Sequence, residues 1–488
     1  MPISFSSTSP APWRPFAVTA TLVALALSAG GCANFAGIGP KARMTEAQTL
    51  GLPSAAASTP APAEPAAPRV AWWSRFGDAQ LDALVQMALD KQPTLRLAQA
   101  RVERAQALAG VVESADLPNV TASAEAMRQR ITANGIYPPP LAGNVIEMPN
   151  AQISASYEFD LFGKNRAALD AALGQVRAAR ADSQAAELLL ATQVTRSYFT
   201  LLRLQALQDL AQRNLAQREQ IVALVQARLK AGLDSPTELQ SSQAALPEIR
   251  QYLESLREQA ALTRNALAAL TGAPLGLQDL KPGTLARITA LPTPQTMPLD
   301  LLANRPDVAA ARARVEAGLS EVEVAKAQFY PNINLVAFAG LNSIGFGNIS
   351  KAGSEQWGVG PAIRLPIFDG GRLRSQLKGK SADVDVAIET YNSLVVDAVR
   401  EVADQVASLQ SIARQSQEQK KAQASAQTLY DIAVQRFAAG LGNQALVLNA
   451  QTAGLNQERV AIELQARALD AHAQLLRATG GSVPTAAP

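Results

Sequence analysis

The chain has 488 residues, of which 48% are hydrophobic but only 5% aromatic. Alanine, leucine and glutamine abound, and this composition favours long helices over one large aromatic core. The 44 basic and 41 acidic residues are interspersed and leave a net charge of +3. Without a basic block, this charge pattern argues against a nucleic-acid-binding protein.

The first 31 residues are typical of a secretory signal. Arg14 precedes a mostly apolar run from Phe16 to Ala29, and two glycines precede Cys32, the single cysteine. The run is too short for a transmembrane helix. Small residues directly before a cysteine resemble the bacterial lipobox, which implies an N-palmitoyl, S-diacylglycerol cysteine at Cys32. The alternative is an ordinary signal peptide followed by a chance cysteine, because Ala29 stands where the lipobox usually has leucine.

A spacer follows the cysteine. Within the spacer 33–70, the stretch from Ser54 to Pro68 is rich in alanine, proline and serine, and the tail 481–488 has a similar composition. We expect both segments to be extended and poorly ordered.

The rest of the chain contains an internal duplication. Residues 93–103 and 306–316 both begin with proline and end in Arg-Val-Glu. Further echoes follow in the same order: Leu117-Pro118-Asn119 with Tyr330-Pro331-Asn332, Phe162…Arg166 with Phe368…Arg372, Ala231-Gly232-Leu233 with Ala439-Gly440-Leu441, and Thr271-Gly272 with Thr479-Gly480. The sequence therefore predicts two structural repeats, 71–298 and 299–480.

Each repeat should open with a helix and continue with two strands. The helices are expected at about 79–115 and 299–328, each ending near a proline, with Asn304-Arg305-Pro306 forming a helix entry or kink. The strands are expected at about 119–130, 151–161, 332–342 and 355–367. In 151–161, apolar residues alternate with Gln152, Ser154, Ser156, Glu158 and Asp160. This length and pattern are typical of membrane-spanning strands, although a half-buried soluble sheet alternates in the same way.

Long helices follow each strand pair. The segments 166–230 and 372–438 predict helices of about 100 Å, and return helices are expected at 237–271 and 444–479. Such lengths far exceed those of globular helices, so these helices must pack side by side as an extended coiled coil or bundle. Pro247 should kink or interrupt the first return helix.

Four strands cannot close into a membrane barrel by themselves. Single-chain barrels have at least about eight strands, and an open sheet would leave backbone groups unpaired in lipid. Either the strands lie outside a membrane, or several chains contribute to one barrel.

The chain resembles the TolC-like outer membrane factors, in the lipoprotein subgroup often labelled NodT. The matching motifs lie in order along both repeats: Trp72-Trp73…Phe76-Gly77-Asp78…Leu81, Tyr157-Glu158-Phe159-Asp160-Leu161-Phe162-Gly163-Lys164, Asn304-Arg305-Pro306-Asp307, Gln328-Phe329-Tyr330-Pro331, Pro366-Ile367-Phe368-Asp369-Gly370-Gly371-Arg372 and Arg400-Glu401-Val402-Ala403-Asp404. The resemblance implies a mainly α-helical fold, in which a homotrimer forms a twelve-stranded outer-membrane β-barrel and a long periplasmic α-helical barrel.

The same resemblance implies a function and partners. The trimer would be the exit duct of a tripartite efflux pump, anchored by lipid in the outer membrane and extending into the periplasm. Its partners would be a periplasmic adaptor and an inner-membrane pump of the resistance–nodulation–division or major-facilitator type. It would passively conduct drugs or other small toxic compounds.

The resemblance also places an aperture and adaptor contact at the two turns between long helices. The candidate residues are Gly232, Leu233, Asp234, Gly440, Leu441, Gly442, Asn443, Gln444 and Asn449, and the polar residues of 151–161 would face the barrel lumen. Many relatives carry a charged pair just after the second turn, where this chain has the uncharged stretch 446–452. We therefore expect aperture closure to depend on apolar and neutral polar contacts.

The sequence indicates neither an enzyme nor a metal or cofactor site. It contains one histidine, His472, which we expect to be solvated or interhelical. The sequence leaves three other interpretations of the function open: a structural or adhesive coiled-coil lipoprotein, a passive porin-like channel, and a type I secretion exit duct.

Overall fold

The computed structural model describes residues 35–45, 71–273, 277, 280, 283–289, 291–292 and 304–481. The predicted signal peptide, Cys32 and most of the spacer and tail lie outside these residues. The chain divides into two compact units, and each unit combines segments from both sequence repeats. The first unit comprises residues 1–43, 105–176 and 313–389, and the second comprises 44–104, 177–312 and 390–488.

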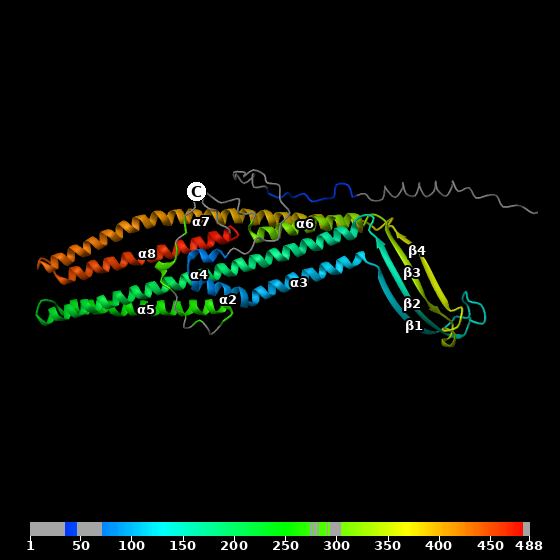
Figure 1. Ribbon diagram of the computed structural model, residues 1–488, viewed down its shortest axis with the longest axis horizontal. Coiled ribbons are helices and arrows are strands. Elements are labelled where there is room, and N and C mark those ends of the chain that lie inside the picture. The colour runs from blue at the N-terminus through cyan, green and yellow to red at the C-terminus, as the bar shows by residue number, and fades with distance from the viewer. Residues whose placement is uncertain are drawn as a thin grey trace, which may run out of the picture. The chain divides into compact units, whose positions relative to one another are not determined.

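The described part of the first unit contains a single antiparallel sheet. Its strands are β1 (Asn119–Arg130), β2 (Val145–Phe159), β3 (Asn332–Asn342) and β4 (Glu355–Arg364), paired in the order β1-β2-β3-β4 (Figure 1). The prediction of four strands is confirmed. Strand β2 begins earlier than expected, because residues from Val145 onward complete the ladder with β1, and β4 ends at Arg364 rather than 367.

The opening helix of the first repeat differs from the prediction. It is divided into α2 (Ala79–Lys91) and α3 (Pro93–Glu113), because Gln92 takes an extended backbone with ψ 124°. Pro93 disfavours the helical conformation of the residue before it and thereby starts a new helix. In the second repeat, α6 (Pro306–Ala327) likewise begins at a proline.

Two helices of 67 residues each, α4 (Lys164–Lys230) and α7 (Arg372–Ala438), follow the two hairpins. In the first unit, α4 and α6 approach closely, since a Cβ on Gly174 would lie 2.8 Å from the Cβ of Ala317. The ion pair between Lys380 and Glu321, at 2.5 Å, joins α7 to α6. Close contact at small residues and the Lys380–Glu321 ion pair therefore contribute to holding these helices together in the first unit.

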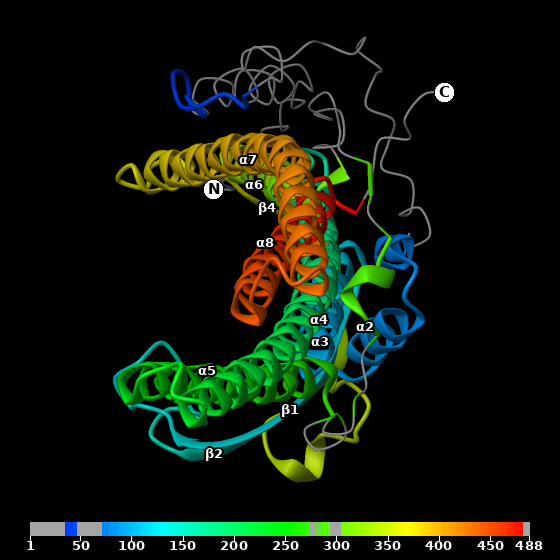
Figure 2. The ribbon, with the colours of Figure 1, turned by 90° about the vertical axis from the view of Figure 1, so that its left-hand side faces the viewer.

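The second unit contains the return helices α5 (Pro236–Thr271) and α8 (Gln444–Ala478). Figure 2 shows α5 beside α4 and α8 beside α7 in this unit. Ion pairs Arg196–Asp470 and Arg203–Glu463 join α4 to α8, so the helices follow the order α5-α4-α8-α7. Pro247 lies inside α5, which continues as a helix to Thr271, so of the two expected effects, a kink or an interruption, the interruption is wrong.

The hydrophobic core of the second unit includes the aromatic residues at 72–76. Trp72 and Phe76, in a short 3₁₀ helix (Trp72–Phe76), are buried against apolar side chains that include Phe199 of α4. Asp78 caps α2 and also accepts a hydrogen bond from the Tyr198 hydroxyl at 2.9 Å. The aromatic motif after the spacer is therefore a packing motif of this unit.

None of the helices that the structure describes carries an apolar stretch long enough to cross a membrane.

Candidate channel wall and helix tips

The sheet has two chemically different faces. Its register places Ile153, Trp357, Val359 and Ile363 on one face, together with alanines of β1 and leucines of β3. These side chains lack a cover within the described chain, as the 77% exposure of Trp357 shows. A sheet face of this kind requires an apolar environment.

The opposite face carries the polar residues predicted for a lumen. Gln152, Ser154, Ser156 and Glu158 alternate along β2, and Gln152 Nε2 donates to Ser154 Oγ at 3.3 Å. Glu158 forms an ion pair with Lys164 at 2.5 Å. Asp160 lies beyond the end of β2, and its carboxylate accepts a hydrogen bond from the backbone N–H of Arg166 at 2.9 Å. Its contact in this structure is thus with the start of α4.

One aromatic residue interrupts the polar face. Phe338 of β3 lies on the same face as Ser154, its register partner, and its ring covers Gly358 of β4. A Cβ on Gly358 would lie 2.7 Å from the Phe338 ring. The weak alternation of β3 hid this residue from sequence reasoning.

The first predicted turn, between α4 and α5, is stabilised by local contacts. Gly232 has a left-handed backbone with φ 71°, a conformation that glycine adopts without steric cost. Arg228 and Asp234 form an ion pair at 2.9 Å across the turn. Ser235 and Glu238 form a reciprocal capping box at the start of α5, so the turn is closed by its own side chains.

The second turn, between α7 and α8, has the same backbone but different side chains. Gly440 has φ 72°, and Asn443 caps α8 by accepting from the N–H of Leu446 at 2.9 Å. Gly442 occupies the position that Asp234 has in the first turn, so the ion pair is not repeated. Leu441, like Leu233 in the first turn, exposes its side chain.

A neutral polar contact joins the two helix pairs a few turns from these ends. Gln217 of α4 is 2% exposed, and its Nε2 donates to the carbonyl oxygen of Leu448 and, at 2.9 Å, to Thr452 Oγ1 on α8. Asn449, predicted as an aperture residue, lies beside Leu448 and is exposed. Sequence reasoning missed Gln217, because its partners are distant in the chain.

A buried charged cluster was also not predicted. Arg305 is 6% exposed on its side chain and bonds Asp307 at 2.7 Å and Glu401 at 2.8 Å, while Arg477 approaches Glu401 at 3.0 Å. Burial alone would raise the pKa of Asp307 and of Glu401, but the hydrogen bonds and charge of Arg305 lower both. The cluster joins the start of α6 to α7 and α8 and belongs to the framework.

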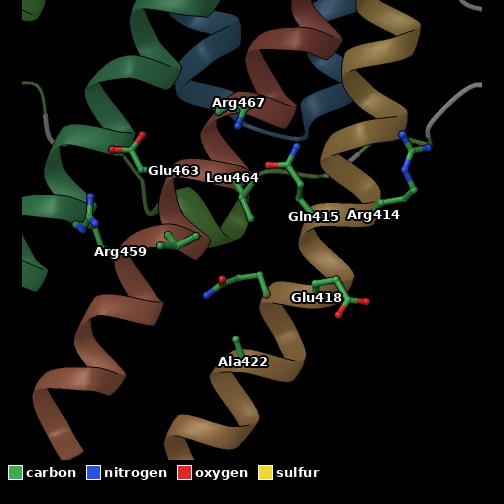
Figure 3. A pocket seen from close by; sticks show the side chains of 10 residues that line it. Arg414, Gln415, Glu418, Ala422, Arg459, Glu463, Leu464 and Arg467 are labelled. Atoms are coloured by element: carbon green, nitrogen blue, oxygen red, sulfur yellow. The ribbon is translucent and has the colours of Figure 1, made fainter.

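The described residues offer no candidate metal site. They contain no group of three metal-ligating side chains. A pocket of about 630 Å³ between α7 and α8 is lined by several charged residues, but Figure 3 shows Arg414 and Glu418 pointing away from α8 and Arg459 pointing away from α7. The charges do not converge on a ligand. His472 is buried, which lowers its pKa to about 4.

A sheet with one apolar and one polar face, combined with two helices of 67 residues, defines a TolC-like channel protein. The family profile described as "Outer membrane efflux protein" matches residues 84–273 and 297–481. The chain belongs to this family, whose members are transport channels.

Individual relatives agree with this assignment. The fusaric acid resistance protein FusA of Burkholderia cepacia is 37% identical over 371 residues, which cover 74% of this chain and 69% of FusA. The putative multidrug resistance outer membrane protein MdtQ of Escherichia coli is 32% identical over 84% of this chain and 87% of MdtQ. The crystal structure of the outer membrane protein VceC of Vibrio cholerae is 33% identical, covers 84% of this chain and 98% of VceC, and superposes with a TM-score of 0.77.

Proposed function

We propose that the chain forms the outer-membrane exit duct of a tripartite efflux pump, as a homotrimer that is anchored by lipid at Cys32 and extends into the periplasm. The observation that carries this proposal is the two-faced sheet, in which β1 and β4 each have one strand neighbour within the described chain. Lipid on the apolar face and water on the polar face would suit both sets of side chains. Each unpaired backbone group at an outer strand edge would cost roughly several kcal/mol in lipid. Strands of neighbouring copies would pair with these edges and remove that cost.

The two sequence repeats would contribute equally to the duct wall. Each repeat supplies one hairpin and one pair of long helices, so three chains would surround a pore with six similar units. A periplasmic adaptor and an inner-membrane pump of the resistance–nodulation–division or major-facilitator type would complete the assembly. The names of FusA and MdtQ support small toxic compounds as the cargo.

The two turns would form the periplasmic aperture and the adaptor contact. The exposed Leu233 and Leu441 offer apolar contacts at the helix ends. Gly232 and Gly440 allow the tight reversals of the chain. The first turn carries a negative charge at Asp234, whereas the candidate residues at the second turn are neutral: Gly442, Asn443, Gln444 and Asn449. The repeats would therefore share the wall but act differently at the aperture.

The proposal is tested in the bacterium that carries this chain. Deletion of the gene should increase intracellular accumulation of fluorescent amphiphilic drugs, and the wild-type gene on a plasmid should restore the lower level. A matched variant with a double proline substitution at Leu233 and Leu441 should reach the outer membrane but fail to restore efflux. Unchanged accumulation of every compound after deletion would reject the efflux role.

A further inference from the structure

The N-terminal segment 35–45, called here the N-terminal strap, is attached to the helices next to the sheet. The Phe35 ring contacts the Phe329 ring edge-to-face, with centroids 5.7 Å apart. The backbone N–H groups of Lys41 and Ala42 donate to the same oxygen, Asp385 Oδ1 of α7, at 2.6 and 2.8 Å. Figure 1 shows this segment in dark blue beside α6 and α7.

The strap ends on the same stripe of α7. The N–H of Thr45 donates to Asn392 Oδ1 at 2.7 Å, and Asp385 and Asn392 are seven residues apart, which places them on one helix face. Ile38 and Met44 of the strap are half-buried. Because the strap has no regular secondary structure, its N–H groups depend on these acceptors, and bonds to a carboxylate are about twice as strong as neutral ones.

The start of the strap lies at the helix-proximal end of the sheet. Phe329 precedes the first residue of β3, Asn332, by three positions, and its neighbour Tyr330 stacks on Phe162 with centroids 4.8 Å apart. Residue 32 is only three positions before Phe35, so a fully extended chain could place it at most about 10 Å away. A lipid on Cys32 would therefore enter the membrane close to the near end of the strands.

We propose that the N-terminal strap is a spacing element that holds the acylated cysteine next to the sheet, so that acyl chains and strands enter the same lipid leaflet. The inference rests on the lipid anchor of the proposed function. Without the contacts to Asp385 and Asn392, residues 33–70 would tether the anchor as a flexible coil with a mean span of roughly 35 Å. The docked strap shortens the distance over which the lipid anchor can move away from the sheet while the sheet inserts into the membrane.

Limited proteolysis tests the docking, because Lys41 and Arg43 are trypsin sites within the strap. In outer-membrane fragments, Asp385→Ala should increase the rate of cleavage after these residues at least tenfold, and Asp385→Asn, which keeps an acceptor oxygen, should lie between Asp385→Ala and wild type. Asp383→Ala is the matched control, since Asp383 is an exposed carboxylate two residues away on α7. Equal cleavage rates in all four proteins would overturn the inference.

A second measurement tests the spacing role. An insertion of ten Gly/Ser residues between positions 34 and 35 lengthens the tether but leaves the strap contacts intact. Both this insertion and Asp385→Ala should lower the yield of heat-resistant oligomer in the outer membrane at least threefold, whereas Asp383→Ala should not. Unchanged yield in the insertion variant would overturn the spacing role. The mass of the N-terminal peptide separately reports lipidation, so an unmodified Cys32 would reject the anchor of the proposed function while leaving the proteolysis result readable.

Discussion

Arg305 connects three segments that are distant in the sequence. Its guanidinium contacts Asp307 and Glu401 and also donates to the carbonyl oxygen of Ala478 at 3.4 Å. Burial alone would lower the pKa of Arg305, but the hydrogen bonds to Asp307 and Glu401 raise it, so the side chain stays charged. The buried charge is stable only because acceptors surround it.

Replacement of Arg305 should therefore destabilise the protein strongly. Removal of one partner from a buried ion pair costs about 3–5 kcal/mol, and we expect the lower end of this range for Arg305→Ala, because Glu401 retains Arg477. The thermal unfolding midpoint of the detergent-solubilised protein measures the effect. Arg400→Ala is the control, since Arg400 makes exposed ion pairs on α7, worth about 0.5 kcal/mol each. Equal shifts for both variants would contradict the role assigned to the cluster.

His472 should make stability depend on pH in a defined window. Burial lowers its pKa to about 4 from 6.5, so the folded state binds fewer protons than the unfolded state between these values. Its contribution to stability is complete above pH 6.5 and is lost as the pH falls toward 4. Since His472 is the single histidine, His472→Gln should flatten the unfolding midpoint across this window, relative to wild type. A wild-type midpoint that is constant from pH 6.5 to 4.5 would contradict this account.

At the scale of elements, the contacts at the helix ends determine what can hold the proposed aperture closed. The ion pair Arg228–Asp234 joins two residues of one turn, whereas the contact of Gln217 with Leu448 and Thr452 crosses from α4 to α8. A bond within one turn fixes the shape of that turn. The ion pairs Arg196–Asp470, Arg203–Glu463 and Arg213–Glu458 also join α4 to α8, but they lie farther from the turns than Gln217 does. Among the described residues, the neutral contact of Gln217 is therefore the link between these two helices that lies nearest to the turns.

Closed-state conductance in planar bilayers should therefore be insensitive to salt. We expect the ratio of channel conductance to bulk conductivity to stay constant from 0.1 to 1 M KCl, because screening weakens exposed ion pairs but not neutral hydrogen bonds. Gln217→Leu should raise the closed-state conductance at least twofold, whereas Asp234→Asn should leave it unchanged. A sharp rise of the ratio with salt would show that charged pairs close the aperture.

Most elements could be predicted from the sequence because their hydrophobic patterns are regular and extend over many residues. The 67-residue helices contain no internal proline, and β2 alternates cleanly from residue 151 onward. Residues 145–150 lack alternation and include Pro149, so the early start of β2 was hidden. The Arg305 cluster, Gln217 and the strap acceptor Asp385 depend on contacts between distant segments, which no local pattern reveals.

At the scale of the whole molecule, the interface between the repeats is a template for the contacts between copies in the proposed trimer. Within the chain, β2 of the first repeat pairs with β3 of the second, and Phe162 at the end of β2 stacks on Tyr330 before β3. The duplicate of Phe162 is Phe368, which is 91% exposed, and the duplicate of Tyr330 is Leu117, which is 63% exposed. Within the described chain, Phe368 and Leu117 do not make the contact that Phe162 and Tyr330 make with each other. Likewise, the outer edges of β4 and β1 have no strand partner within the described chain.

The template also defines a register for the contact between copies. In the two hairpins Thr121 pairs with Ser154 and Asn334 pairs with Ala362, so Ser154 corresponds to Ala362. Ser154 of β2 pairs with Phe338 of β3, and the position of β1 that is equivalent to Phe338 in the other repeat is Glu125. Ala362 of one copy should therefore face Glu125 of the next, with both residues on the polar face. A slip by one residue would reverse the faces of the neighbouring strands, so the parity of this register is a constraint on the assembly.

Disulfide crosslinking measures this register directly. Opposed residues of neighbouring antiparallel strands have Cβ atoms about 4.5–5.5 Å apart, close enough for a disulfide after minor adjustment. The double variant Ala362→Cys and Glu125→Cys should form covalent oligomers under mild oxidation in outer-membrane fragments, with a trimer as the largest species. Ala362→Cys with Ala124→Cys is the matched control, because residue 124 lies on the opposite face, and each single variant controls for Cys32. Crosslinking of the control pair at the same rate would reject the register, and a ladder beyond the trimer would reject a closed ring of three, because only a closed ring leaves no free β1 and β4 edges to add further copies.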